Sequence, residues 1–252
     1  MDLELAGKRA IVTGGSRGIG KVIAEVLAGE GVDVAIAARG GDALAASARE
    51  LAAVTGRKIV PLVADTGNTE SVNRLVGRAI EELGGVDILV NNAAVPGGIS
   101  PATRLEQIVD QEVLDDVDIK VVGYLRTARA LAPHLVAKGW GRIINIGGLA
   151  IHRTGRPVAT LRNVGVAAIT KNLADELGPK GVNVTAVHPG ATRTERTDPK
   201  SEPTLAAGIG IGRLVDAKEV AWLVAFLASP KSVAINGDAI PAGGGSPGVI
   251  HY

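Results

Sequence analysis

The sequence predicts an α/β fold in which one doubly wound parallel sheet carries helices on both faces. Short apolar runs alternate with longer amphipathic stretches along the 252 residues, a glycine-rich turn follows the first apolar run, and no linker or repeat divides the chain. Alternating strands and helices pair in parallel because each crossover returns to the same edge with right-handed sense. With 46% hydrophobic residues, we expect a single domain over residues 1–252.

The strands are predicted where apolar and β-branched residues run between Gly, Pro or polar breaks. Six such runs are Lys8–Thr13, Val32–Ala38, Lys58–Ala64, Val86–Asn91, Arg142–Ile146 and Val182–His188. A last strand is expected at Asp238–Ala242, where Pro241 suits a strand end or an edge.

The helices are predicted where apolar residues recur with helical spacing. These segments are Gly18–Gly29, Ala43–Thr55, Thr69–Leu83, Leu105–Lys138, Val158–Leu177 and Ala217–Ala228. The charged stretch Arg193–Pro203, with two prolines, is predicted to be a mobile loop. It follows the sixth strand at the end of the sheet where ligands bind, so we expect it to act as a lid.

Composition excludes several classes of partner. The 27 basic and 26 acidic residues give a net charge of +1 and form no basic stripe, so we expect no nucleic acid. There is no cysteine, and the four histidines, His134, His152, His188 and His251, show no metal-ligand spacing, so no metal is expected. The sequence shows no signal peptide or membrane helix. We therefore expect a cytoplasmic protein that acts on a small molecule.

A nucleotide-binding cradle is predicted at the first turn. Its sequence is Thr13-Gly14-Gly15-Ser16-Arg17-Gly18-Ile19-Gly20, which follows an apolar strand and opens a helix. Glycines without side chains let a pyrophosphate approach the backbone amides at the helix N-terminus. We therefore assign Gly14, Ser16, Arg17, Gly18, Ile19 and Gly20 to cofactor binding.

The second strand indicates which dinucleotide is bound. It ends Ala37-Ala38-Arg39 and lacks the acid that would bind both ribose hydroxyls of NAD. Arg39 and Arg17 instead match a 2′-phosphate, because guanidinium forks fit phosphate oxygens in charge and geometry. NADP(H) is thus preferred over NAD(H); the alternative is that both arginines are solvated surface residues.

The spacing Thr-Gly-x-x-x-Gly-Ile-Gly resembles the short-chain dehydrogenase/reductase family. Further landmarks across nearly the whole chain are Asn91-Asn92-Ala93-Ala94, Pro189-Gly190 with Thr194, Ile235-Asn236-Gly237 and Gly243-Gly244. The resemblance implies a Rossmann-type sheet of about seven strands and an NAD(P)-dependent oxidoreductase that forms a homodimer or homotetramer. It also implies that Asp65 accepts a hydrogen bond from the adenine amine and that Thr194 holds the carboxamide. The same resemblance adds Thr66, Asn92, Ala93, Asn163, Pro189 and Gly190 to the cofactor-binding set.

The family's catalytic residues have no counterparts here. The family uses a tyrosine, a lysine one helical turn later, a serine, and an asparagine on the preceding helix. Counting from Ile169-Thr170-Lys171 and Pro189-Gly190 assigns these positions to Ala159, Asn163, Gly147 or Gly148, and Lys120. The only tyrosines, Tyr124 and Tyr252, lie elsewhere.

Lys120 is the candidate replacement. Its ammonium would point into the space left at Ala159 and donate a proton, provided that burial or nearby positive charge lowers its pKa. Alternatively, Lys120 extends into water, as lysines on helices usually do. The chain is therefore either an oxidoreductase with a non-standard site, acting on an activated carbonyl or imine, or a catalytically silent cofactor-binding module.

Five other side chains are weighed for the same site. Tyr124 is expected to pack in its helix, and His188 to be held at a strand end by a backbone partner. His152 and Arg153 either face the substrate or belong to a solvated loop. Tyr252 would reach a neighbouring subunit only if the chain terminus is ordered.

Overall fold

The central sheet of the computed structural model, which describes residues 1–247, has seven parallel strands in the order β3-β2-β1-β4-β5-β6-β9. The strands are β1 (Arg9–Thr13), β2 (Asp33–Ala38), β3 (Ile59–Val63), β4 (Ile88–Asn91), β5 (Gly141–Ile146), β6 (Val182–Pro189) and β9 (Ala239–Ala242). Strand order reverses between β1 and β4. This doubly wound arrangement confirms the predicted fold class and opens a crevice where β1 and β4 end.

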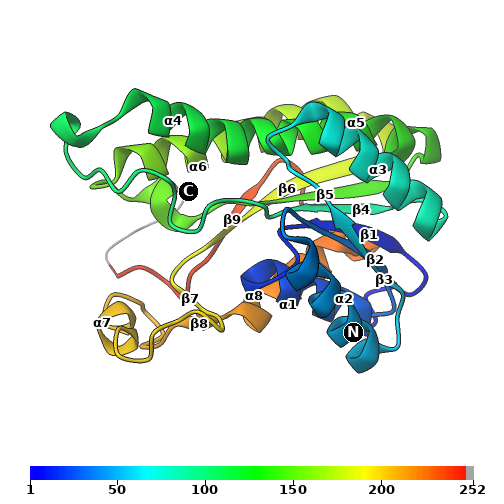
Figure 1. The fold of residues 1–252 in the computed structure, drawn as a ribbon, viewed down its shortest axis with the longest axis horizontal. Coiled ribbons are helices and arrows are strands. Elements are labelled where there is room, and N and C mark those ends of the chain that lie inside the picture. Colours follow the sequence, from blue (N-terminus) through cyan, green and yellow to red (C-terminus); the bar gives the residue numbers. More distant parts are fainter. Residues whose placement is uncertain (248–252) are drawn as a thin grey trace.

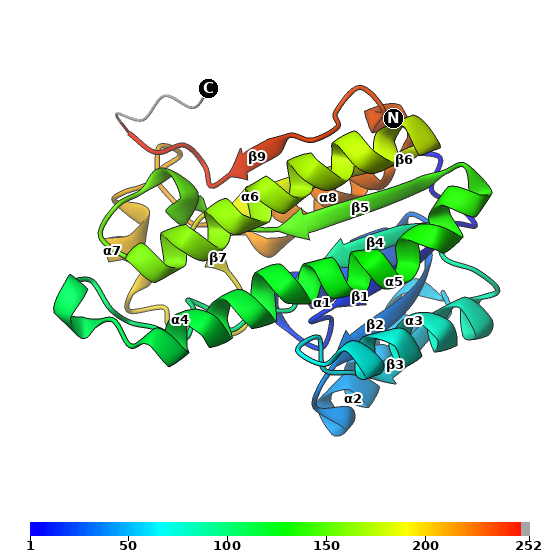
Figure 2. The same ribbon diagram turned by 90° about the horizontal axis from the view of Figure 1, so that it is seen from above.

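Helices cover both faces of the sheet (Figure 1). One face carries α1 (Gly18–Gly29), α2 (Gly41–Thr55) and α8 (Ala217–Ala228). The other carries α3 (Thr69–Leu83), α5 (Gly123–Lys138) and α6 (Pro157–Leu177), which lie side by side in Figure 2. Every residue of β4, β5 and β6 is buried, as expected for central parallel strands covered on both faces.

The predicted helix Leu105–Lys138 is wrong as a single element. A 3-10 turn, η1 (Leu105–Gln107), precedes α4 (Asp110–Val117), and a π-helical turn, η2 (Asp118–Val122), joins α4 to α5. Ile108 and Val109 adopt extended dihedrals, which their branched side chains favour, so the helix begins only at Asp110. π turns inside helices frequently mark functional sites, and η2 carries Lys120.

The segment predicted to be a mobile loop is shorter than expected. Arg193 ends β7 (Thr192–Arg193), which pairs with β8 (Val215–Asp216), and α7 (Glu202–Ala206) includes Pro203. Only residues 194–201 connect β7 to α7. These elements lie together beyond the carboxyl ends of the strands of the large sheet (Figure 1). None of the helices in residues 1–247 combines the length and the apolar character that crossing a membrane requires.

Candidate functional site

A cavity of about 960 Å³ lies at the carboxyl end of the sheet and gathers residues from the turns after most of its strands. Every residue predicted to bind cofactor lines it except Gly20: Gly14, Ser16, Arg17, Gly18, Ile19, Arg39, Asp65, Thr66, Asn92, Ala93, Asn163, Pro189, Gly190 and Thr194. Gly20 lies behind the cradle, where a Cβ atom would overlap the Gly14 carbonyl. Gly20 therefore permits close packing behind the cradle, and its part in cofactor binding stays a prediction.

The cradle is held open by backbone geometry and by a link between β1 and β4. Gly14 and Gly18 have φ of +68° and +58°, the left-handed region in which glycine is favoured. Asn92 donates from Nδ2 to the Thr13 carbonyl at 3.0 Å, and Thr13 Oγ1 accepts from the Asn92 and Ala93 amides at 2.9 and 3.1 Å. A Cβ atom on Gly14 would lie 2.7 Å from Asn92 Nδ2, so the turn has no room for a side chain.

The N-terminus of α1 already receives an anionic group in this structure. The Gly18 amide donates to Glu195 Oε1 at 2.9 Å, and the N-cap residue, Arg17, provides no side-chain cap. Helix N-termini bind anions because free amides and the helix dipole both favour negative charge. Arg17 and Arg39 are exposed and line the same cavity, and together these features fit a dinucleotide.

Lys120 points inward and not into water. Its residue is 4% exposed, and its Nζ donates to the Gly147 carbonyl at 2.8 Å and to Asn163 Oδ1 at 3.0 Å. Asn163 Nδ2 in turn donates to the Ala159 carbonyl at 2.7 Å, which orients its Oδ1 toward the amine. The structure thus excludes the alternative in which Lys120 extends into solvent.

Burial, and after it the nearby Arg162 guanidinium, lower the pKa of Lys120 to about 7, and the Asp116 carboxylate opposes part of that shift. Both acceptors of the amine are uncharged oxygens, so no direct ion pair stabilises the ammonium. At neutral pH the protonated and free amine forms of Lys120 are both populated.

The pair Arg162 and Asp116 was missed by reasoning from the sequence. Arg162 Nη1 lies 2.9 Å from Asp116 Oδ1 and also donates to the Val95 carbonyl at 3.3 Å. Both side chains are buried, and Arg162 lines the cavity. The only signal in the sequence was a charged residue immediately before Asn163 on an otherwise small and apolar helix face.

His188 fills the space beside Gly147. A Cβ atom on Gly147 would overlap His188 Nδ1, the same atom that accepts from the Gly148 amide at 3.0 Å. This backbone contact at the end of β6 confirms the expected partner. Burial lowers the pKa of His188 to about 4, so the imidazole is neutral at neutral pH.

Tyr124 does not line the cavity. It is fully buried, its hydroxyl donates to the Ile146 carbonyl at 2.9 Å, and burial raises its pKa. This confirms its packing role.

His152 ends the turn η3 (Leu149–His152), and Arg153 donates to Ser246 Oγ at 2.7 Å; neither lines the cavity. Tyr252 lies outside the described residues, and no tyrosine within them lines the cavity.

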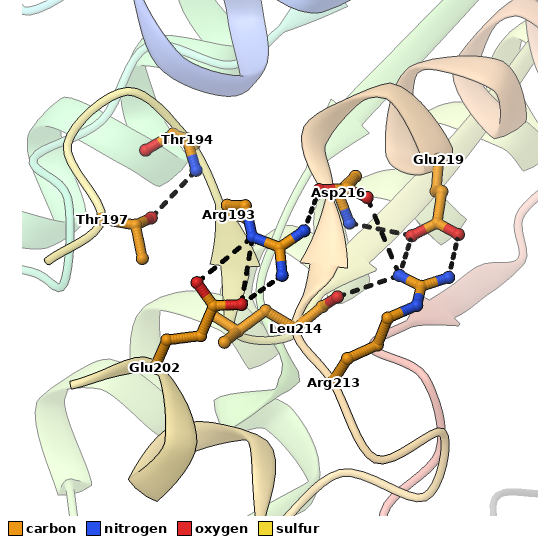
Figure 3. A network of polar contacts seen from close by, with 8 residues as sticks. All are labelled: Arg193, Thr194, Thr197, Glu202, Arg213, Leu214, Asp216 and Glu219. Carbon is orange, nitrogen blue, oxygen red and sulfur yellow. Dashed lines mark hydrogen bonds and ion pairs between the residues drawn. The ribbon is translucent and has the colours of Figure 1, made fainter. Parts of the chain in front are cut away.

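Thr194 reaches the cavity from a firmly anchored strand (Figure 3). The preceding residue, Arg193, forms ion pairs with Glu202 of α7 and with Asp216 at the start of α8, the latter at 2.7 Å. The Thr194 amide donates to Thr197 Oγ1 at 2.9 Å. The charged character of this segment was noted from the sequence, but its ion-pair partners were not.

Known proteins match nearly the full length of this chain. A family model described as enoyl-(acyl carrier protein) reductase matches residues 14–246. The 3-oxoacyl-(acyl-carrier-protein) reductase FabG of Vibrio cholerae is 36% identical over 250 residues, covering 96% of this chain and 98% of the relative. The enzyme of the same name from Escherichia coli is 35% identical over 248 residues, with the same coverage.

Solved structures agree with the fold. L-sorbose reductase from Gluconobacter frateurii, solved with NADPH and L-sorbose, superposes with a TM-score of 0.91 at 27% identity, covering 99% of this chain and all of the other. A short-chain type dehydrogenase/reductase from Mycobacterium marinum superposes with a TM-score of 0.89 at 33% identity, covering 98% of each chain. With its doubly wound sheet, its glycine cradle and these matches along nearly its full length, the chain belongs to the short-chain dehydrogenase/reductase family.

Proposed function

We propose that the protein is an NADP(H)-dependent oxidoreductase that reduces an activated carbonyl or an imine, with Lys120 as the proton donor. The observation that carries this proposal is the buried Lys120 amine, which lines the cofactor cavity with a pKa of about 7. A general acid works best when its pKa lies near the working pH.

The chain's own residues define the cofactor half of this proposal. The pyrophosphate would lie against the amides at the start of α1, and the 2′-phosphate between Arg17 and Arg39. Asp65 would receive the adenine amine, and Thr194 the carboxamide. NADPH, when bound, supplies a hydride. L-sorbose reductase from Gluconobacter frateurii, whose structure was solved with NADPH, supports the choice of this cofactor.

Lys120 is arranged to give up one proton and keep two. An ammonium has three N–H donors, and the structure provides two fixed acceptors, the Gly147 carbonyl and Asn163 Oδ1. The third proton is available to a substrate oxygen on which negative charge develops. The amine that remains still satisfies both acceptors, and its neutral form is the one that burial favours.

The hydrogen bonds of Asn163 support the same role. Lys120 and Asn163 stand at the positions where the family resemblance implies an asparagine and a lysine, so the two residue types are exchanged. Because Asn163 Nδ2 is engaged by the Ala159 carbonyl, its Oδ1 remains directed at Lys120. A conjugated carbonyl or a neutral imine takes up one proton when it is reduced, so either suits a donor of this kind.

The proposal is tested with wild type, Lys120→Ala and, as a matched control, Lys218→Ala, since Lys218 is an exposed lysine on α8. NADPH binding is followed by fluorescence titration, and NADPH oxidation is followed with a panel of ketones, conjugated carbonyls and cyclic imines. We expect Lys120→Ala to lower kcat/KM by roughly 10²-fold or more, the range for loss of a general acid, with little change in NADPH affinity. We expect Lys218→Ala to behave like wild type.

Two results would contradict the proposal. Turnover that survives in Lys120→Ala at the wild-type rate would remove Lys120 from the chemistry. NADPH binding without turnover of any panel member, in wild type and variant alike, would favour a silent cofactor-binding module.

A further inference from the structure

The Glu195 carboxylate occupies the position at which a dinucleotide pyrophosphate is expected to meet α1. Its Oε1 accepts from the Gly18 amide at 2.9 Å, across 177 residues of sequence. Gly18 is the first residue of α1, the 12-residue helix that follows the glycine turn. A carboxylate at this amide uses the same electrostatic attraction that a phosphate oxygen would use.

The turn that presents Glu195 is closed by its own hydrogen bonds. The Thr194 amide donates to Thr197 Oγ1 at 2.9 Å, and the Thr197 amide donates back to the Thr194 carbonyl at 3.0 Å. The Arg196 amide also donates to Thr194 Oγ1 at 3.3 Å. These bonds hold residues 194–197 in one compact turn, with Glu195 directed at the cradle.

The base of this turn is fixed from the other side (Figure 3). Arg193 Nε donates to Glu202 Oε1 at 3.1 Å, and its Nη1 lies 2.7 Å from Asp216 Oδ1. The Asp216 amide donates to Glu219 Oε2 at 2.8 Å, and the Glu219 carboxylate pairs with the Arg213 guanidinium at 2.7 Å. Glu195 can therefore leave the cradle by a change within the short turn, while Arg193 keeps α7 and α8 in place.

The charged side chains near Gly18 also indicate that Glu195 affects the binding of an anion at the cradle. The Arg196 guanidinium lies beside Gly18, because a Cβ atom there would be 3.5 Å from its Nη2. The turn thus brings one acid and one base to the same glycine. Neutralising Glu195 removes the carboxylate that accepts from Gly18 and leaves the Arg17 and Arg196 guanidinium groups at the cavity.

From this geometry we propose that Glu195 is an affinity-setting residue that competes with the pyrophosphate of the cofactor for the N-terminus of α1. The inference rests on the proposed binding of NADP(H). Before the pyrophosphate binds, the carboxylate must give up its hydrogen bond to Gly18 and move away from the incoming negative charge. Both steps weaken binding, so the native affinity is lower than the cradle alone would give.

The experiment compares wild type with Glu195→Gln and Glu30→Gln. Gln keeps the size of the side chain and an oxygen that can accept from Gly18, but it removes the charge. Glu30 is the exposed C-cap residue of the same helix, so its variant matches the change in net charge without touching the cradle. The measured quantity is the dissociation constant of NADPH, with adenosine 2′-phosphate as a second ligand that lacks the pyrophosphate.

We expect Glu195→Gln to bind NADPH roughly tenfold more tightly than wild type, the scale of one lost charge-assisted hydrogen bond together with relief of repulsion. We expect its affinity for adenosine 2′-phosphate to stay unchanged, and Glu30→Gln to match wild type with both ligands. The gain should shrink as salt is raised, because salt screens exposed charges.

Other outcomes overturn the inference in distinguishable ways. Equal or weaker NADPH binding by Glu195→Gln would mean that the carboxylate coexists with the cofactor or assists it, and the proposed function would stand. A tenfold gain for adenosine 2′-phosphate as well would mean that Glu195 acts as a general surface charge. Binding of NADPH to neither protein would overturn both proposals. Tighter binding without turnover of any substrate would support this inference and count against the proposed function.

Discussion

At the scale of single residues, the space beside Gly147 can hold either the His188 imidazole or a side chain at position 147, but not both. His188 fills the volume that any side chain at position 147 would need, and it accepts a hydrogen bond from the Gly148 amide. Gly147 and Gly148 therefore line the cavity and also contact the His188 imidazole. The Gly147 carbonyl, held in this way, becomes an acceptor for Lys120.

This arrangement predicts a coupled pair of substitutions. Gly147→Ser should destabilise the protein by about 1–3 kcal/mol, since it overpacks a buried site against His188. In Gly147→Ser with His188→Ala, the new side chain enters the vacated space, so the double variant should lose less stability than the sum of the single losses. Urea unfolding of wild type, both single variants and the double variant measures the coupling. Strict additivity would show that His188 does not limit residue 147.

Several residues of the site were predictable, and the reason lies in local pattern. The glycine turn and the Asn, Pro and Thr landmarks are short motifs, so their positions could be assigned without a fold. Lys120 could be proposed only by counting to an alignment position, and the sequence left its direction open. The buried pair Arg162 and Asp116 and the contact of Glu195 with Gly18 join residues 46 and 177 positions apart. No local pattern indicates such partners.

At the scale of elements, strands were predicted more closely than helix interruptions. Each strand of the large sheet was placed within a residue or two, because buried parallel strands leave continuous apolar runs. The interruptions between Leu105 and Gly123 were not visible in helical periodicity. A π turn keeps helical dihedrals on both sides. Tertiary contacts favour it here, because Lys120 turns into the cavity and donates to oxygens on the turn after β5 and on α6.

The ion-pair network around Arg193 could not be predicted from the sequence either. β7 and β8 are strands of two residues each, too short to leave an alternating pattern in the sequence. Arg193, Glu202 and Asp216 come from three separate elements and meet only in the folded chain. The charged stretch was predicted to be a mobile loop, but its residue Arg193 fixes one end of that loop through ion pairs.

At the scale of the whole molecule, the order of the strands decides where the site lies. The reversal between β1 and β4 places the cradle, the Asn92 link and the Lys120 pocket in one cavity. Alternation of strands and helices in the sequence was enough to predict this edge. It did not predict which surfaces remain uncovered.

The family resemblance implies a homodimer or homotetramer, and we propose that α4 and α6 form an interface between copies of this chain. Leu114 on α4 and Leu161 and Val164 on α6 are 63%, 52% and 45% exposed, on two helices that contact each other. Apolar side chains on adjoining helices suit a two-fold interface, which uses the same patch on both subunits. Leu161→Glu with Val164→Glu should therefore shift the mass found by light scattering toward the monomer, with the far-UV circular dichroism spectrum retained. A wild-type protein that is monomeric at micromolar concentration would contradict this interface.

The proton donor is the central claim, and the pH dependence of carbonyl reduction by wild type and Lys120→Arg tests it most directly. With a folded pKa of about 7, the Lys120 ammonium is lost as pH rises through neutrality, so wild-type kcat/KM should be highest below pH ~7 and fall up to tenfold per pH unit above it. An arginine stays protonated throughout, so the variant should be slower but nearly flat from pH ~6 to ~9. The same falling limb in both proteins would mean that another group delivers the proton.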